Sequence, residues 1–138
     1  MGTWAVDAFG NDYAQDWAED LAQVTSLEAV ENTLDVALQT AGGMLEAPYA
    51  VEALVAIEVL ARLQGKGGAQ TEDSRAVDTW VAARKAKARV RSDLAEKAQQ
   101  VLELVLAPSC ELRELWEDSE HYAEWTASVA DLRARLQA

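Results

Sequence analysis

The sequence contains little that could fix its fold through covalent or metal chemistry. It has one cysteine, one histidine, two prolines and seven glycines among 138 residues. The single cysteine, Cys110, cannot form an internal disulfide, so folding cannot depend on oxidation. Because glycine and proline are the residues that most often interrupt helices, their low number favours helical structure.

Long hydrophobic segments and targeting signals are also missing. The longest uninterrupted apolar run, Ala53 to Ile57, is far shorter than the roughly 20 residues that cross a bilayer. The amino terminus has no basic region followed by an apolar stretch, which is the pattern of a secretory signal. We therefore expect a cytoplasmic protein that does not associate with a membrane.

Positive charge is absent from the first part of the chain. Residues 1–61 contain eleven acidic side chains and no Lys or Arg. The formal charges of residues 1–61, 62–97 and 98–138 are −11, +4 and −5, within a total of −12. Such a chain repels nucleic acid and attracts basic proteins or cations. The alternative is that the acidic residues only keep helix surfaces hydrated.

What the sequence does contain is a period of about 3.6 residues in its apolar positions. We predict an all-α fold, with one domain over residues 1–138 built as an irregular or orthogonal bundle of six to seven helices. Helices are expected to begin near Asn11, Thr25, Pro48, Asp73, Ser92 or Asp93, and Ser109, with a last helix from Tyr122 to Leu136.

The segment from Pro48 to Leu63 has apolar residues on nearly all sides, which is typical of a central helix surrounded by others. Pro48 suits the first position of this helix, where its missing N–H has no partner to lose. No Gly or Pro occurs between Ala69 and Ala107, so the fourth and fifth helices could instead be one bent helix.

The opening residues carry the most distinctive motif, MGTWAVDAFGNDYAQDW. This motif resembles a bacterial family known as domain of unknown function 4259, in which Met-Gly-x-Trp-Gly-x-Gly-x-Phe precedes Asn-Asp, Ala and Asp-Trp. Ala5 and Asp7 stand where that family has glycine. The likeness continues through Leu45–Pro48, Ser109–Trp116 and Asp131–Arg133, and it implies an all-helical domain but no particular chemistry. The matching opening residues are Gly2, Trp4, Phe9, Asn11, Asp12, Ala14, Asp16 and Trp17.

Residues 1–10 are predicted to form an irregular arm that packs on the body of the domain. Trp4 and Phe9 could each bury on the order of 150–250 Å². Asn11 or Asp12 could cap the first helix by accepting a backbone N–H. This arm could either plug the core or line a pocket. The other residues to which we assign a structural role are Trp17, Trp116 and Trp125.

Acidic side chains of the first predicted helix are the main candidates for binding a partner. Asp12, Asp16 and Asp20 are four residues apart, with Glu19 alongside, and like charges at this spacing destabilise an isolated helix. Either later basic residues pair with them, or a cation or a basic partner does. The basic residues considered for internal pairing are Arg84, Lys85, Lys87, Arg89 and Arg91.

Glu58, in the predicted central helix, is the remaining candidate. A carboxylate among apolar residues is costly unless it is paired, and Arg62 follows at the helical spacing of four. A buried ion pair is therefore one interpretation. The other is an acidic group activated by burial in a pocket.

The remaining reactive residues form no recognisable catalytic set. His121 and Cys110 fall on different predicted helices, so a nucleophile and base pair is not indicated. The Gly65–Gly68 loop lacks the preceding strand and the ending of a phosphate-binding loop. The basic segment Arg84–Arg91 has no aromatic residue that could stack on bases. We predict no metal site, no cofactor and no nucleic acid partner.

We therefore predict a non-catalytic interaction or regulatory protein whose acidic first half binds a basic protein partner. The alternative is a carboxylate-based metal-binding or enzymatic site near the first and third helices. Homodimerisation through an apolar helix face is a third possibility, so the oligomeric state stays open. The candidate contact residues are Asp12, Asp16, Glu19, Asp20 and Glu58.

Overall fold

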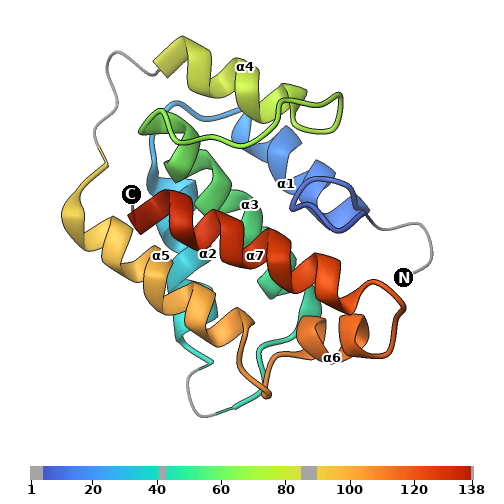
Figure 1. The fold of residues 1–138 in the computed structure, drawn as a ribbon. Coiled ribbons are helices and arrows are strands. Elements are labelled where there is room, and N and C mark those ends of the chain that lie inside the picture. Colours follow the sequence, from blue (N-terminus) through green and yellow to red (C-terminus); the bar gives the residue numbers. More distant parts are fainter. Residues whose placement is uncertain (1–4, 41–42, 85–89, 138) are drawn as a thin grey trace.

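The computed structural model describes residues 5–40, 43–84 and 90–137. Within these ranges the chain forms seven α-helices and no strand longer than a single bridge (Figure 1). The predicted all-α class is confirmed, and the number of helices agrees with the predicted six to seven. The helices are α1 (Asp12–Leu21), α2 (Glu28–Leu38), α3 (Ala47–Leu63), α4 (Arg75–Arg84), α5 (Ser92–Val105), α6 (Glu111–Glu117) and α7 (Tyr122–Gln137).

Helix α3 lies at the centre of the bundle and contacts each of the other six helices (Figure 1). Fourteen of its 17 residues are buried, among them Val55, Ile57 and Leu60. A helix with apolar side chains all round has no side to offer to water, so the other helices must surround it. We predicted Pro48 as the first residue of this helix. The helix begins at Ala47, so Pro48 is its second residue. Neither position needs the missing N–H.

The start of α1 agrees with the prediction from sequence. Asn11 has an extended backbone and its Oδ1 accepts the N–H of Ala14 at 2.8 Å, so Asn11 and not Asp12 is the cap. The helix ends at Leu21. The carbonyl oxygen of Val24 accepts hydrogen bonds from two side chains of α4, Trp80 at 2.9 Å and Arg84 at 3.2 Å. These bonds hold the turn between α1 and α2 against α4.

The second helix begins at Glu28, three residues after its predicted start at Thr25. Leu27 and not Thr25 occupies the position before α2, and the Oγ of Ser26 accepts the N–H of Glu28 at 3.3 Å. Ser and Thr can each satisfy a free helical N–H, so sequence spacing alone could not decide between the two neighbouring hydroxyls.

The predicted start of the sixth helix was also wrong, because a tertiary contact occupies Ser109. The carbonyl oxygen of Ser109 accepts the N–H of Leu45 at 3.1 Å, and the N–H of Glu111 donates to the carbonyl oxygen of Leu45 at 2.9 Å. This parallel bridge between Leu45 and Cys110 moves the start of α6 to Glu111. In return, the Oε1 of Glu111 accepts the N–H of Ala47 at 2.7 Å and so caps the central helix.

Helices α4 and α5 are separate, so the alternative of one bent helix was wrong. Arg91 has an extended backbone with φ −65° and ψ 149°, which is outside the helical region. Arg91 therefore occupies the cap position for which we had predicted Ser92 or Asp93. Helix α4 begins at Arg75, two residues after its predicted start at Asp73.

Residues 5–10 form a closed loop that contains no helix or strand. The Oδ1 of Asp7 accepts the N–H groups of Phe9 at 2.8 Å and Gly10 at 2.9 Å, and the N–H of Ala5 donates to the carbonyl oxygen of Gly10 at 3.0 Å. The loop thereby directs Phe9 into the core, where it is 4% exposed. Trp4, which we predicted to anchor the same arm, lies outside the described residues.

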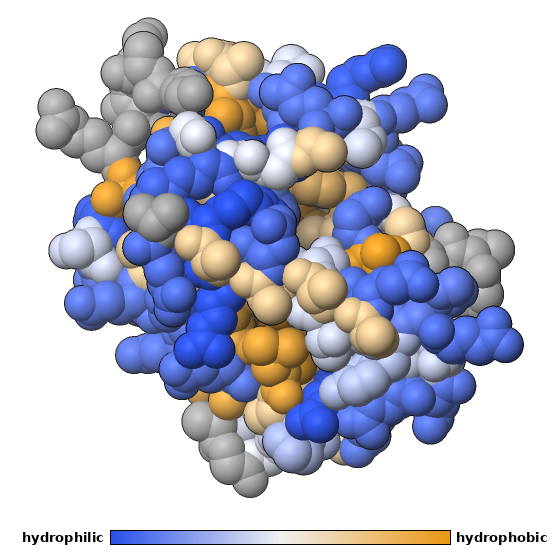
Figure 2. Space-filling view, viewed as in Figure 1, coloured by the Kyte–Doolittle hydropathy of each residue, from blue (hydrophilic) through white to orange (hydrophobic). Residues whose placement is uncertain are grey.

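The surface seen in Figure 2 is largely hydrophilic, with hydrophobic side chains gathered mainly where α5 packs against α7. None of the helices in the described ranges is long and apolar enough to cross a membrane.

Candidate functional site

The four candidate carboxylates of α1 are exposed. The buried side of this helix is made by Ala14, Trp17, Ala18 and Leu21. The Nε1 of Trp17 donates to the Oγ1 of Thr33 at 2.9 Å, which fixes the rotation of α1 against α2. This rotation leaves on the surface the side chains of Asp12, Asp16, Glu19 and Asp20. Within the described residues, no ion pair joins any of the four to a Lys or Arg.

The basic residues that we considered as partners for α1 are engaged elsewhere or lie outside the described ranges. The Arg84 guanidinium lies over the Trp80 ring, 4.5 Å from its centroid, and donates to the carbonyl oxygen of Val24 at 3.2 Å. Arg91 pairs with Glu31 on α2, at 2.6 Å between Nη2 and Oε2. The residues that the structure does not describe are Lys85, Lys87 and Arg89.

The acidic residues of α2 that face α5 are paired. The Nζ of Lys97 lies 3.2 Å from the Oε2 of Glu31 and 2.9 Å from the Oδ1 of Asp35. Glu31 also binds Arg91. Residues 1–61 contain no Lys or Arg, and the fold places two basic residues from later in the sequence, Arg91 and Lys97, beside the carboxylates of α2.

Glu58 is also paired, and its environment is more buried. Its Oε1 is 2.7 Å from the Nη2 of Arg135, and its Oε2 is 3.5 Å from the Nε of Arg62. Arg62 in turn reaches Asp78, at 2.6 Å between Nη1 and Oδ1. Glu58 and Arg62 are each 6% exposed. The ion-pair interpretation of the sequence is therefore confirmed, and the structure adds Arg135 and Asp78 as partners.

Arg62 is enclosed by three segments that sequence reasoning did not connect. The Phe9 ring centroid lies 5.0 Å from its guanidinium carbon, and the carbonyl oxygen of Ala69 accepts from Nη2 at 3.0 Å. A Cβ at Gly67 would come within 2.7 Å of the Arg62 Cγ, so the loop after α3 needs glycine at this point. Arg62 thereby links the loop of residues 5–10, α3, α4 and the Gly65–Gly68 loop.

A polar cavity of about 160 Å³ lies beside this ion-pair network, between the loop of residues 5–10, α3 and α7. Its charged side chains already have partners. Asp131 binds Arg135 at 2.9 Å, between Oδ2 and Nε, and Asp7 accepts the two backbone N–H groups of its own loop. The carboxylates of this cavity thus already accept hydrogen bonds or form ion pairs, and its three carboxylates against two guanidiniums leave a formal charge of −1.

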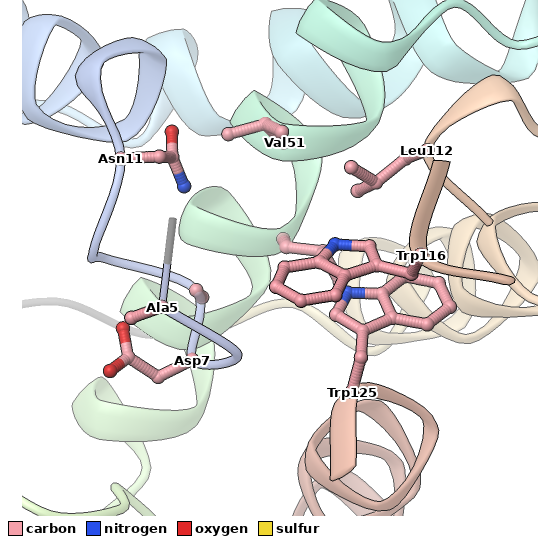
Figure 3. A pocket seen from close by; sticks show the side chains of 9 residues that line it. Ala5, Asp7, Asn11, Val51, Leu112, Trp116 and Trp125 are labelled. Atoms are coloured by element: carbon pink, nitrogen blue, oxygen red, sulfur yellow. The ribbon is translucent and has the colours of Figure 1, made fainter. Parts of the chain in front are cut away.

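On its other side the same loop leaves almost no space. Asn11, Asp7 and Ala5 face Val51, Leu112 and the Trp116 and Trp125 indoles across a gap of about 10 Å³ (Figure 3). The two indoles are stacked, with centroids 6.3 Å apart and ring planes at 11°. A space of this size holds at most about one water. The loop of residues 5–10 thus packs tightly against the core beside Trp116 and Trp125, and it lines the polar cavity beside Arg62 and Arg135.

The described residues contain no group of three His, Cys, Asp or Glu side chains that could hold a metal ion. Burial raises the pKa of the Cys110 thiol, which keeps it in the unreactive protonated form at neutral pH. His121 is exposed, and its Nδ1 lies 3.2 Å from the Oε1 of Glu124. The alternative of an enzymatic or metal-binding site near the first and third helices stays a prediction.

Glu52 is a candidate that sequence reasoning passed over. It is half-buried on α3, beside a cavity of about 160 Å³ that faces α2. Burial and the nearby Asp20 carboxylate raise the pKa of Glu52, in that order of importance. A signal did exist in the sequence: the positions four residues before and after Glu52 are Pro48 and Ala56, so no helical neighbour can neutralise it.

The fold and these sites define the chain as a helical-bundle domain with an acidic surface. The carboxylates of α1 on this surface have no ion-pair partner among the described residues, and a cavity lies beside Glu52. The chain belongs to the family described as domain of unknown function 4259, whose model matches residues 2–128. This match confirms the resemblance that the opening motif indicated. No curated protein and no solved structure shows significant similarity to the chain.

Proposed function

We propose that this chain is a non-catalytic cytoplasmic interaction protein whose first helix binds a basic surface of another protein. One observation carries the proposal: the four exposed carboxylates of α1 have no ion-pair partner among the described residues, whereas Glu31, Asp35 and Glu58 do. An unbalanced acidic surface attracts positively charged proteins and speeds their association. Lys and Arg side chains of the partner would supply the counter-charge that α1 lacks.

The proposal is tested by recovering a partner from native lysate on the immobilised chain. Binding through α1 predicts a basic partner that is retained at about 0.15 M salt and released at about 1 M, where the Debye length falls from about 8 Å to 3 Å. The charge-reversed variant Asp16→Lys/Asp20→Lys should lose this partner.

A matched control is available at the end of α6. Glu114 and Asp118 are also exposed, are also four residues apart, and form no ion pair within the described residues. The variant Glu114→Lys/Asp118→Lys changes the net charge by the same amount as the α1 variant. Loss of the partner with the α1 variant alone supports the proposal. Equal loss with both variants, or retention by both, contradicts it.

A further inference from the structure

The cavity beside Glu52 is lined by one charged side chain, two polar ones and two large hydrophobic ones. It measures about 160 Å³ and is lined by Asn32, Thr33 and Val36 of α2 and by Tyr49 and Glu52 of α3. Val36 is 39% exposed and Tyr49 is 43% exposed, although both are large hydrophobic residues. A cavity of roughly 150 Å³ admits a molecule the size of benzene, so a planar group can enter this one.

The carboxylate of Glu52 has no partner of its own. No hydrogen bond or ion pair within the described residues reaches this side chain, although it is half-buried. A partly desolvated and unpaired carboxylate beside a second one, Asp20, costs stability. A residue that weakens the fold in this way is typical of a binding site, where an occupant supplies the missing interaction.

The other polar groups of the cavity indicate which kind of ligand it can bind. The Oγ1 of Thr33 already accepts from Trp17 and donates to the carbonyl oxygen of Ala29, each at 2.9 Å. The Glu52 carboxylate, the Asn32 amide and the Tyr49 hydroxyl remain, which together offer fewer oxygens than the six or more that a hard divalent cation takes. A flat organic cation fits better, because its head can bind a carboxylate while its apolar part contacts Val36 and Tyr49.

We propose that this cavity seats an arginine side chain of the basic partner, with Glu52 as the acceptor and the Tyr49 ring as the surface against which the guanidinium lies. The inference rests on the proposed function, because the arginine belongs to the partner that α1 attracts. Arginine is favoured over lysine since its planar fork binds a carboxylate through two parallel hydrogen bonds and stacks on aromatic rings.

The test uses the full chain labelled with ¹⁵N and titrated with N-acetyl-arginine amide as the probe. Amide shifts should change around Asn32, Val36, Tyr49 and Glu52. The variant Glu52→Gln, which keeps the shape of the side chain, should weaken binding by about tenfold. Tyr49→Ala should weaken it by a few-fold.

Two controls separate this site from general attraction to an acidic protein. Glu19→Gln removes the same charge from the exposed side of α1 and should change binding less than about twofold. N-acetyl-citrulline amide has the same shape as the probe without its charge and should not bind. Binding that survives Glu52→Gln, matches that of the citrulline probe, or shifts mainly the amides of α1 overturns the inference.

The result can be separated from the outcome of the proposed function. If the partner is captured through α1 and Glu52→Gln has no effect on either partner or probe, only the arginine site is wrong. If no salt-sensitive partner is captured but the probe binds at Glu52, the arginine site stands and the role of α1 is wrong.

Discussion

Helices α1 and α2 carry the same arrangement of charge and are treated differently by the fold. Asp16 and Asp20 on α1, like Glu31 and Asp35 on α2, are acidic residues four positions apart, and each pair is repulsive in an isolated helix. The Nζ of Lys97 on α5 lies 3.2 Å from a carboxylate oxygen of Glu31 and 2.9 Å from one of Asp35, and it neutralises both. No described basic residue does so for the α1 pair. An identical local pattern can therefore be structural in one helix and available for binding in another.

The largest effect is expected where the pairing is most buried. Arg62→Met removes the cation that lies between Glu58 and Asp78 and should lower the free energy of unfolding by about 3 kcal/mol or more. Urea titration followed by tryptophan fluorescence measures this. Arg133→Met, at the exposed 3.6 Å pair with Glu103, is the control and should change stability by less than about 0.5 kcal/mol. Equal effects of the two variants would mean that the network is not buried in solution.

The close approach of the Gly65–Gly68 loop to Arg62 gives the second prediction. Gly67→Ala places a Cβ 2.7 Å from the Cγ of Arg62, so one of the two must move, at a cost of about 1–3 kcal/mol. Gly43→Ala is the control, because its added Cβ meets nothing closer than the carbonyl oxygen of Thr40 at 3.6 Å. Thermal unfolding of both variants tests this. A Gly67 variant as stable as the Gly43 variant would contradict the packing described around Arg62.

The α2 pair should show a smaller effect that depends on salt. Lys97→Met leaves Asp35 without a partner and Glu31 with Arg91 alone, so the variant should be slightly less stable than the parent chain at low ionic strength. The cost should shrink in about 1 M NaCl, where exposed charges are screened. A cost that is the same at both salt concentrations would show that Lys97 acts through packing of its aliphatic chain instead.

The smallest effect on the free energy of unfolding is expected for Glu52, where the substitution should stabilise the chain instead of destabilising it. Because the pKa of Glu52 is raised in the folded state, its charge opposes folding once the pH exceeds that raised value. Glu52→Gln should therefore stabilise the chain at neutral pH, by no more than about 0.5 kcal/mol since the site is partly exposed. The gain should vanish below the ordinary value of 4.5, where Glu52 is protonated in both states. A loss of stability at neutral pH would indicate a partner for Glu52 within the chain.

The sequence predicted those parts of the fold that depend on periodicity. The central helix followed from the apolar residues on all sides of Pro48–Leu63, and the cap of α1 followed from Asn11. The start of α6 could not be predicted, because it depends on the bridge between Leu45 and Cys110, which are distant in the sequence. Hydroxyl residues near a helix start indicate that a cap exists more reliably than they show which residue provides it.

The same limit applies to the sites. Arg62 was predicted to pair with Glu58 because the two are one helical turn apart. Arg135 was not, although it follows the buried Leu132 at a spacing of three, which places both near one side of α7. For Glu52, the sequence shows that no helical neighbour can neutralise the carboxylate, but it does not show the cavity beside it, because no local pattern encodes the position of α2.

The central claim, that the α1 carboxylates are unpaired while those of α2 are paired, is tested most directly by two matched double variants. The free energy of unfolding should be unchanged or higher in Asp16→Asn/Asp20→Asn, because the repulsion between neighbouring charges is removed. It should fall in Glu31→Gln/Asp35→Asn, because Lys97 loses both of its partners and Arg91 keeps only Asp93. A loss of about 1 kcal/mol or more in the α1 variant would contradict the account, since it would mean that the chain itself pairs these carboxylates.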